Sequence, residues 1–220
     1  GKSDIYIDGK LRNKPFHQEL NDGKRHCVQD GYHNYYLLDG NNVQIQIARQ
    51  DSRHEKTRAE TQGTFASAYI NHGASPQNAQ YEYMVLIQPT PEEVNAACRE
   101  IPYRILHKDS IAHVVADRQT GITAYAAFET YLPSKDKIFL SIPAETMVMQ
   151  KQSGHNLLLS VCDPNLNISE KAYTTKEPSR PIEKRLILKG KWKSAMPHKK
   201  VTVHSNQAET TIIVICQHGQ

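Results

Sequence analysis

The residues best suited to bind a ligand lie around Trp192, the single tryptophan of the chain, in the segment Lys189–Lys193. An aromatic ring flanked by Lys191 and Lys193 could stack on a sugar ring while the ammonium groups meet sulfates or carboxylates. The same residues could instead form an edge strand, with the tryptophan anchored in the core and the lysines blocking further strand pairing. Lys191, Trp192 and Lys193 are therefore candidate binding residues for an anionic glycan, and a core role for Trp192 is the alternative.

Charge is distributed unevenly along the 220 residues, whose net charge is +4. Residues 151–220 hold 11 Lys and Arg against 5 Asp and Glu, whereas residues 1–150 hold 16 against 18. A basic C-terminal third favours an anionic partner such as a sulfated glycan, nucleic acid or acidic lipid, although a solvated basic surface explains it as well. No nucleic-acid-binding motif accompanies the charge, so a nucleic acid is not the expected partner.

Motifs for enzymatic chemistry are missing from the sequence. It has no Gly-x-Ser-x-Gly nucleophile elbow and no glycine-rich phosphate loop. His107 and His113 flank a predicted turn and could lie close together, but the spacing indicates no third metal ligand. The polar run 51–58 is expected to be a solvated loop. The sequence therefore predicts no catalytic residue, no metal site and no cofactor in this chain.

The four cysteines, Cys27, Cys98, Cys162 and Cys216, are widely separated in the sequence. Their spacing does not match a zinc site. It permits disulfides without demanding them, and we expect buried free thiols.

Short strands separated by turn residues dominate the chain. Four Asp-Gly pairs occur in the first forty residues, and this dipeptide suits tight hairpin turns. The alternation of apolar and polar residues over Val43–Ile47 is typical of a strand with one buried face. Strands are predicted at 5–7, 33–38, 43–47, 64–70, 81–87, 103–106, 112–116, 122–128, 138–142, 146–150, 157–161, 184–188, 201–203 and 211–216. This pattern predicts an all-β protein of antiparallel β-sandwiches.

One short helix is predicted at 91–99. Thr90 precedes Pro91, and Glu93 occupies the third helical position, which together form a capping box. Ile101-Pro102 ends the helix. We expect this helix to pack on a sheet without carrying chemistry.

A domain boundary is predicted near Pro143, where the charge balance begins to shift, which divides the chain into 1–143 and 144–220. No apolar run approaches the ~20 residues that a membrane-spanning helix needs. Both ends of the sequence suggest a piece of a longer protein.

Several segments resemble the C-terminal part of bacterial chondroitin sulfate ABC lyases, in polysaccharide lyase family 8. The most specific is Thr61–Gly73, a small-Phe-x-x-Ala-aromatic-Ile-x-His strand that leads through Pro76 into the Tyr81-Glu82-Tyr83 strand. Tyr6–Lys10 resembles an earlier segment, and Ser160–Asn167 and Gly190–Trp192 resemble elements of the small C-terminal domain. The similar segments occur in the family's order along nearly the whole chain.

The resemblance implies that 1–143 is the end of a large central β-sandwich domain and 144–220 a small C-terminal β-sandwich. Such lyases cleave uronate-containing glycosaminoglycans (chondroitin sulfate, dermatan sulfate or hyaluronan) by β-elimination, with a Tyr acid/base assisted by His or Asn, Arg and Glu. Those motif positions fall outside this chain, so the resemblance implies that it is non-catalytic and packs against an N-terminal helical toroid. A periplasmic or secreted location and stimulation of the parent protein by a divalent cation are further expectations. A stand-alone module that binds anionic glycans remains the alternative.

Overall fold

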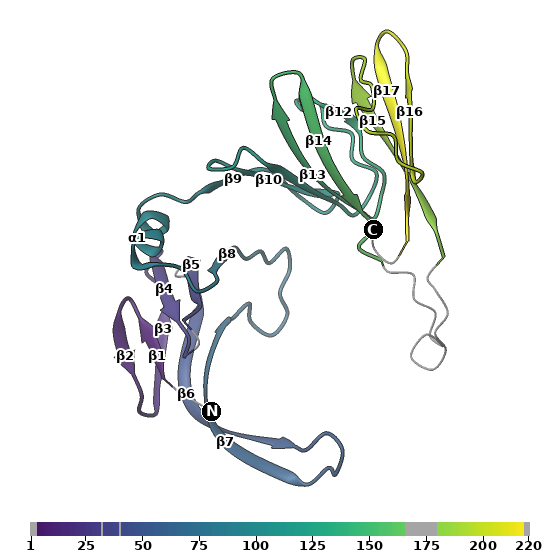
Figure 1. Ribbon diagram of the computed structural model, residues 1–220. Helices are drawn as coiled ribbons and strands as arrows, with labels where there is room; N and C mark the ends of the chain where they lie inside the picture. Colours follow the sequence, from purple (N-terminus) through teal and green to yellow (C-terminus); the bar gives the residue numbers. More distant parts are fainter. Residues whose placement is uncertain (1–3, 32, 40, 166–179, 218–220) are drawn as a thin grey trace. The chain divides into compact units, whose positions relative to one another are not determined.

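The computed structural model describes residues 4–31, 33–39, 41–165 and 180–217, and it divides into two compact units. Unit 1 spans Gly1–Ile101 and unit 2 spans Pro102–Gln220. Each unit contains two antiparallel sheets, and Figure 1 shows their strands along the chain. The predicted all-β class of antiparallel sandwiches is confirmed.

Unit 1 pairs a five-stranded sheet with a three-stranded one. The larger sheet has the strand order β2-β1-β4-β5-β8, and the smaller sheet has the order β3-β6-β7. The strands are β1 (Ile5–Ile7), β2 (Lys10–Arg12), β3 (Phe16–Leu20), β4 (Arg25–Gln29), β5 (Tyr35–Asp39), β6 (Val43–Arg53), β7 (Glu60–Ile70) and β8 (Tyr83–Leu86).

The core of unit 1 forms where these two sheets face each other. Ile5, Ile7 and Val28 from the larger sheet meet Val43, Ile45 and Ile47 of β6. The alternation that predicted a strand at Val43–Ile47 is confirmed, since Val43, Ile45 and Ile47 are all buried. The prediction of a loop at 51–58 is wrong in part, because β6 continues to Arg53 and pairs with β7 there.

The Asp8-Gly9 pair forms the hairpin turn between β1 and β2. Asp8 has φ 49° and Gly9 has φ 76°, the left-handed conformation that such a turn requires. The Asp8 carboxylate also accepts a hydrogen bond from the backbone N–H of Cys27 at 2.8 Å. The turn is thereby fastened to β4.

Helix α1 (Pro91–Arg99) has the bounds that the sequence predicts. Thr90 Oγ1 accepts from the Glu93 N–H at 3.3 Å, and the Thr90 N–H donates to Glu93 Oε2 at 2.7 Å, so the capping box is confirmed. Ala97 is buried, and Glu92 and Glu93 lie in the first turn, where the helix dipole favours negative charge.

Unit 2 is a sandwich of a five-stranded and a four-stranded sheet. Their strand orders are β14-β13-β11-β10-β9 and β12-β15-β17-β16. The strands are β9 (Tyr103–Lys108), β10 (Ala112–Asp117), β11 (Thr123–Ala127), β12 (Phe139–Ser141), β13 (Thr146–Ser153), β14 (Asn156–Cys162), β15 (Ile182–Lys189), β16 (Val201–Ser205) and β17 (Glu209–Cys216).

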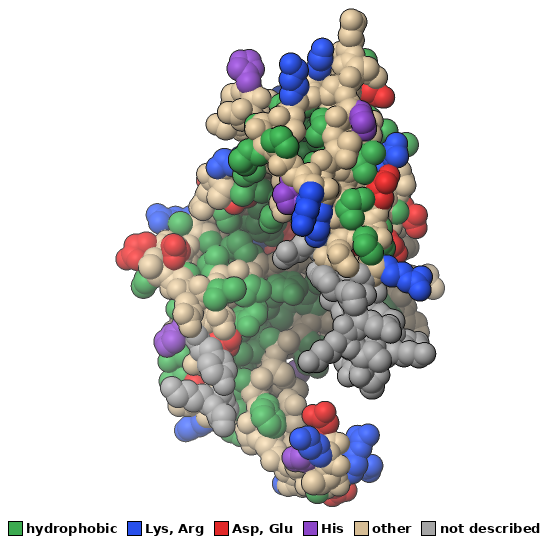
Figure 2. Space-filling view, turned by 45° about the vertical axis from the view of Figure 1, so that its right-hand side comes forward, with side chains coloured by type: hydrophobic (Ala, Val, Ile, Leu, Met, Phe, Trp, Pro, Cys, Tyr) green, Lys and Arg blue, Asp and Glu red, His purple; other side chains and the backbone are tan. Residues whose placement is uncertain are grey.

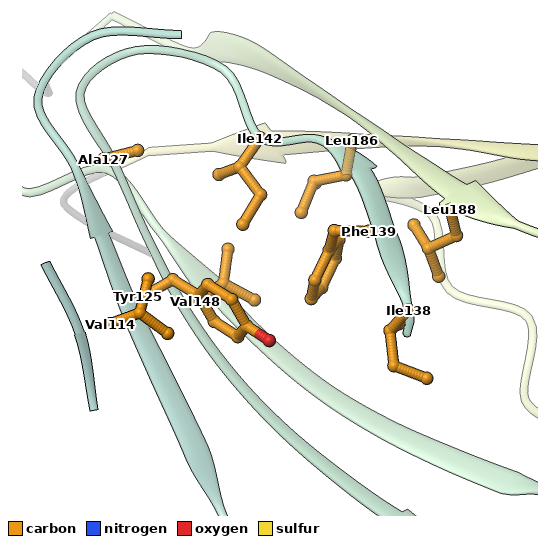
Figure 3. Packing of buried hydrophobic residues seen from close by; sticks show 9 residues of the cluster. All are labelled: Val114, Tyr125, Ala127, Ile138, Phe139, Ile142, Val148, Leu186 and Leu188. Atoms are coloured by element: carbon orange, nitrogen blue, oxygen red, sulfur yellow. The ribbon is translucent and has the colours of Figure 1, made fainter. Parts of the chain in front are cut away.

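The core of unit 2 is filled from both sheets (Figure 3). Phe139 and Leu186 are fully buried, and the ring of Phe139 meets that of Tyr125 edge-on at a centroid distance of 5.1 Å. The Tyr125 hydroxyl donates to Asp136 at 2.6 Å, so the polar end of this buried ring is satisfied. The core therefore combines close packing with a paired polar group.

The division into units differs from the boundary predicted near Pro143. β11 precedes that residue and β13 follows it, yet the two strands pair in one sheet, with Ala127 opposite Thr146. The compact units instead separate between Ile101 and Pro102. The shift in charge balance near Pro143 therefore occurs inside unit 2.

The four cysteines are free thiols, but their burial differs from the expectation. Cys216 is buried, Cys27 and Cys162 are half-buried, and Cys98 is exposed. The expectation of buried thiols is therefore right only for Cys216, and Cys98 is exposed although it directly follows the buried Ala97 on α1.

Candidate functional site

An apolar hollow of about 870 Å³ opens on unit 1. We call it the aromatic hollow, and its walls come from β1, β4, β5, β7 and the segment leading into β8. Its lining comprises Asp4, Ile5, Val28, Asp30, Gly31, Tyr36, Leu38, residues 64–70, His72, Tyr81 and Tyr83. Figure 2 shows hydrophobic side chains exposed on one face of the molecule and charged ones at the tip of the β6–β7 hairpin.

Four aromatic side chains of the hollow are far more exposed than aromatic residues usually are in a folded domain. Phe65, Tyr69, Tyr81 and Tyr83 are 48–62% exposed. The rings of Tyr81 and Tyr83 are stacked at a centroid distance of 6.1 Å, and His72 lies 6.2 Å from Tyr81. Clustered exposed aromatic groups indicate a surface that meets another molecule or another part of the same protein.

The ring of Phe65 lies directly over Gly63 on β7. A Cβ added at Gly63 would come within 2.5 Å of that ring. Glycine at this position therefore lets the Phe65 ring lie flat along its own strand.

Polar groups at one side of the hollow are centred on Asp30. Its carboxylate accepts from the Asn34 N–H at 3.0 Å and from the Tyr36 hydroxyl at 3.2 Å. Burial, followed by the charge of Asp30, raises the pKa of Tyr36. A raised pKa keeps this phenol protonated, which is the opposite of what a tyrosine acting as a base requires.

Ser67 adds a second polar group to the wall formed by β7. Its hydroxyl oxygen is buried and has no hydrogen-bond partner within the described part of the chain. A buried hydroxyl without a partner is costly, so a contacting group that supplies a donor or acceptor is favoured at this wall.

Strand β7 borders the hollow, and one of its edges pairs with no strand among the described residues. Its 11 residues pair with β6 on one side, and it ends the order β3-β6-β7 of its sheet. A long unpaired edge presents a row of backbone donors and acceptors to any further strand. The aromatic hollow and this edge therefore lie side by side in unit 1.

The predicted binding residues lie in unit 2, on the segment that follows β15. Trp192 is half-buried and packs against the core of unit 2. Its indole N–H donates to the Lys189 carbonyl, and its backbone N–H donates to Thr210 Oγ1, both at 2.8 Å. These contacts favour the core role for Trp192, while Lys191 and Lys193 are exposed. Glycan binding by the three residues stays a prediction.

The two histidines considered for a metal site contact different residues. His107 Nε2 lies 2.9 Å from Asp109 Oδ2, whereas His113 packs edge-on against Phe128. Within the described ranges, no three His, Cys, Asp or Glu side chains cluster closely enough to hold a metal ion. Among the same residues, no helix is long and apolar enough to cross a membrane.

A cluster of one histidine and two aspartates was not expected from the sequence. His26 Nδ1 lies 2.8 Å from Asp8 Oδ2, and His26 Nε2 lies 2.9 Å from Asp22 Oδ1. Although partial burial acts against it, the hydrogen bonds to Asp22 and Asp8 raise the pKa of His26 overall. The cluster joins two turns of unit 1, and we assign it a structural role.

The aromatic hollow was likewise not predicted as a site, although a signal was present. Phe65 and Tyr69 share one face of β7, and Tyr81 lies two residues before Tyr83, where β8 begins. Aromatic residues at every second or fourth position of a strand mark a continuous wall.

The fold is similar to that of polysaccharide lyases of known structure. It aligns with a xanthan lyase from Paenibacillus over 97% of this chain and 21% of that chain, with a TM-score of 0.68 at 15% identity. At this identity the likeness establishes the fold, which is the β-sandwich architecture of such lyases.

The sequence comparisons show a similarity to one family of these lyases. Residues 2–98 match the model of the polysaccharide lyase family 8 super-sandwich domain. A chondroitin sulfate ABC endolyase of Proteus vulgaris is 28% identical over 90% of this chain and 19% of that protein. A chondroitin sulfate ABC exolyase of the same organism is 36% identical over 61% of this chain and 13% of that protein.

The predicted resemblance is thus confirmed: residues 2–98 match the super-sandwich domain of polysaccharide lyase family 8, and the chain is similar to chondroitin sulfate ABC lyases. It spans about one fifth of the length of the endolyase that it matches. Of the segment Ser160–Asn167, residues 166–167 lie outside the described residues.

Proposed function

We propose that this chain is a non-catalytic β-sandwich portion of a glycosaminoglycan lyase that acts by β-elimination on chondroitin sulfate, dermatan sulfate or hyaluronan. In this proposal it closes one wall of the substrate cleft and packs against a helical toroid elsewhere in the same protein. The relatives named as chondroitin sulfate lyases and the small share of their length that this chain spans support the proposal.

The aromatic hollow is the observation that carries this proposal. The exposed rings of Phe65, Tyr69 and Tyr83 lie next to the unpaired edge of β7, an arrangement that a further strand could satisfy through main-chain bonds and apolar contact. We therefore assign the hollow to another polypeptide segment of the parent protein.

Charge favours this occupant over the glycan itself. Asp4 and Asp30 line the hollow, and Lys and Arg are absent from its described lining. A sulfated or uronate-containing chain would be repelled by these carboxylates, whereas an uncharged strand would not.

Two measurements test the proposal. The absorbance of unsaturated uronate products, with chondroitin sulfate, dermatan sulfate and hyaluronan as substrates, should stay at the blank for the isolated chain and rise with the parent protein. Turnover by the isolated chain would refute the non-catalytic role. Amide hydrogen exchange along β7 should be slower in the parent than in the isolated chain, and equal rates would refute the docking of a strand at this edge.

The exposed lysines of unit 2 favour a second candidate, a module that binds anionic glycans. Lys191 and Lys193 are exposed beside the half-buried Trp192. On a chondroitin sulfate or heparin column, Lys191→Ala and Lys193→Ala should elute at lower salt than the unchanged protein, with Lys151→Ala of β13 as the matched control for loss of one charge. If the salt concentration of elution falls equally for all three variants, binding is due to the overall basic surface and not to a site at Trp192.

We extend the proposal to location and cofactors. The parent protein is proposed to be periplasmic or secreted, and fractionation of the producing bacterium checks this. Any requirement for a divalent cation is proposed to reside outside this chain, so a chelator should leave the thermal unfolding midpoint (Tm) of the isolated chain unchanged. Nucleic acid is not a proposed partner.

A further inference from the structure

Two hydrogen bonds at opposite ends of the β6–β7 hairpin determine which backbone groups of β7 face its open edge. The Asn71 N–H donates to the Asn42 carbonyl at 2.8 Å, and the His54 N–H donates to the Ala59 carbonyl at 2.8 Å. Both pairs continue the register of the β6–β7 ladder, which runs between them without a bulge. They are therefore hydrogen-bonded pairs of one regular antiparallel ladder.

The backbone groups of β7 alternate between its two edges. Hydrogen-bonded and non-hydrogen-bonded pairs alternate along an antiparallel ladder, so the odd-numbered residues of β7 bond to β6, as Ala59 and Asn71 do. The even-numbered residues turn their N–H and C=O groups toward the other edge, which pairs with no strand among the described residues. Along the aromatic hollow these residues are Thr64, Ala66, Ala68 and Ile70.

The side chains of these even-numbered residues leave the core of unit 1 open at the edge. Ala66 and Ile70 pack against that core, and Ala68 lies opposite Ile45, which is fully buried on β6. Ala68 itself is nevertheless exposed. Because positions 66 and 68 carry only methyl groups, a neighbouring strand has room here for large apolar side chains.

The odd-numbered residues present a different chemistry on the opposite face of β7. Ser67 lies between Phe65 and Tyr69, and its buried hydroxyl has no hydrogen-bond partner within the described part of the chain. Residues directly opposite each other in a ladder have their side chains on the same face. A strand paired with β7 therefore places one side chain beside Ser67, where a hydroxyl or amide group would satisfy this buried oxygen.

We propose that the open edge of β7 pairs with an extended segment of the parent protein, about seven residues long, that exchanges main-chain hydrogen bonds with residues 64, 66, 68 and 70. Its side chains opposite Ala66 and Ala68 are large and apolar, and the one opposite Ser67 carries a hydroxyl or amide group. This inference rests on the proposed function, which assigns the hollow to another segment, and it specifies the atoms and side chains that hold that segment.

The charge of the hollow specifies the segment further. Asp4 and Asp30 line the hollow, and its described lining contains no Lys or Arg. A carboxylate on the paired segment would be repelled by these two aspartates. The segment is therefore free of Asp and Glu where it lies in the hollow.

Proline variants of the isolated chain test the assignment of the backbone groups. Ala68→Pro removes an N–H of the open edge, where proline is tolerated, so the urea midpoint should stay within about 0.5 M of that of the unchanged protein. Ser67→Pro removes an N–H that bonds to Gln46 of β6, and the midpoint should fall by about 1–3 M. Circular dichroism measures both. Equal losses for the two variants would overturn the assignment.

Amide hydrogen exchange resolved to single residues tests the pairing in the parent protein. The amides of Ala66 and Ala68 should exchange at least about 100-fold more slowly in the parent than in the isolated chain, whereas those of Ser67 and Tyr69 should be protected in both. Unchanged rates at Ala66 and Ala68 would overturn the proposal. So would protection of these two amides in the isolated chain that rises with protein concentration, because a second copy would then pair with the edge.

Oxidation of tyrosine rings by hydroxyl radicals separates failure of this inference from failure of the proposed function. If Tyr69 and Tyr81 are shielded in the parent while Ala66 and Ala68 exchange at unchanged rates, the hollow is filled without strand pairing. This inference then fails, and the assignment of the hollow to another segment stands. If the rings are oxidised equally in both proteins, that assignment fails as well.

A matched pair of variants in the parent protein isolates the main-chain bond. Ala68→Pro should lower the thermal unfolding midpoint of the parent, because the N–H that bonds to the segment is lost. Ala68→Ser keeps this N–H at nearly the same side-chain size and should leave the midpoint unchanged. Equal midpoints for the two variants would overturn the proposal.

Discussion

The two units are both β-sandwiches, but they differ in how far their aromatic side chains are buried. In unit 2, Phe139 and Leu186 are fully buried and Tyr125 is paired with Asp136, so the sandwich closes on itself. In unit 1, by contrast, one side of the sandwich opens into the aromatic hollow, where Phe65 and Tyr83 are about half exposed. A sandwich that leaves such rings uncovered around a hollow meets additional surface elsewhere.

The largest expected effect contrasts one phenylalanine in each unit. Phe139→Ala should lower the free energy of unfolding of unit 2 by about 3–5 kcal/mol, because it empties a fully buried site. Phe65→Ala should cost less than about 1 kcal/mol in the isolated chain, since its ring is half exposed. Urea unfolding checks both, with Trp192 fluorescence reporting on unit 2 and circular dichroism on the whole chain. Equal losses in the free energy of unfolding for the two variants would contradict the difference drawn between the two sandwiches.

The next largest loss of stability is expected at a buried ion pair in unit 2. Lys184 is 5% exposed, donates to the Glu145 carbonyl at 2.8 Å and lies 3.7 Å from Asp163. Lys184→Ala should destabilise unit 2 by about 3 kcal/mol, because it leaves a buried carboxylate without its cation. Arg185→Ala, at the exposed neighbouring position, should cost at most about 0.5 kcal/mol. Similar costs for both variants in urea unfolding would contradict the role given to Lys184.

A smaller effect is expected at Tyr125. Tyr125→Phe removes the hydroxyl that donates to Asp136 and should cost about 1–2 kcal/mol. Asp136 still accepts hydrogen bonds from the backbone N–H groups of Ile138 and Phe139, so the segment from Asp136 to Phe139 should keep its conformation. Tyr131→Phe is the control, because its ring contact with His107 is preserved, and it should change the unfolding free energy less. The reverse ranking in thermal unfolding would contradict this role of the Tyr125 hydroxyl.

The smallest effect is a pH dependence that belongs to unit 1. The pKa of His26 is raised in the folded state, so its stabilising effect is complete below about pH 6.5, the unfolded value, and is lost as pH rises through the folded pKa. The hydrogen bond from His26 lowers the pKa of Asp22, which therefore stays ionised in this window. The urea midpoint of His26→Gln should lie furthest below that of the unchanged protein at acidic pH. His204→Gln, exposed on β16, is the control. A deficit that grows toward alkaline pH would contradict the sign.

Local patterns were enough to predict the β class and the helix. The alternation in β6 and the Thr90–Glu93 capping box each act over a few residues, and both are confirmed. Strands β3 and β4 were not predicted, because FHQEL and RHCVQ are largely polar and gain their pairing partners only in the fold. The unit boundary depends on pairing across Pro143, which is likewise non-local. The aromatic hollow could not be predicted as a cavity, since it depends on where two sheets end.

The packing of Phe65 over Gly63 has a consequence for sequence variation. A side chain at position 63 would strike the Phe65 ring as it now lies, so the ring would have to turn away to make room. In relatives of this chain we expect glycine at the first position wherever the second is a large aromatic, and freer variation where the second is small. Such paired substitutions would show in which relatives the β7 side of the aromatic hollow carries a large aromatic ring.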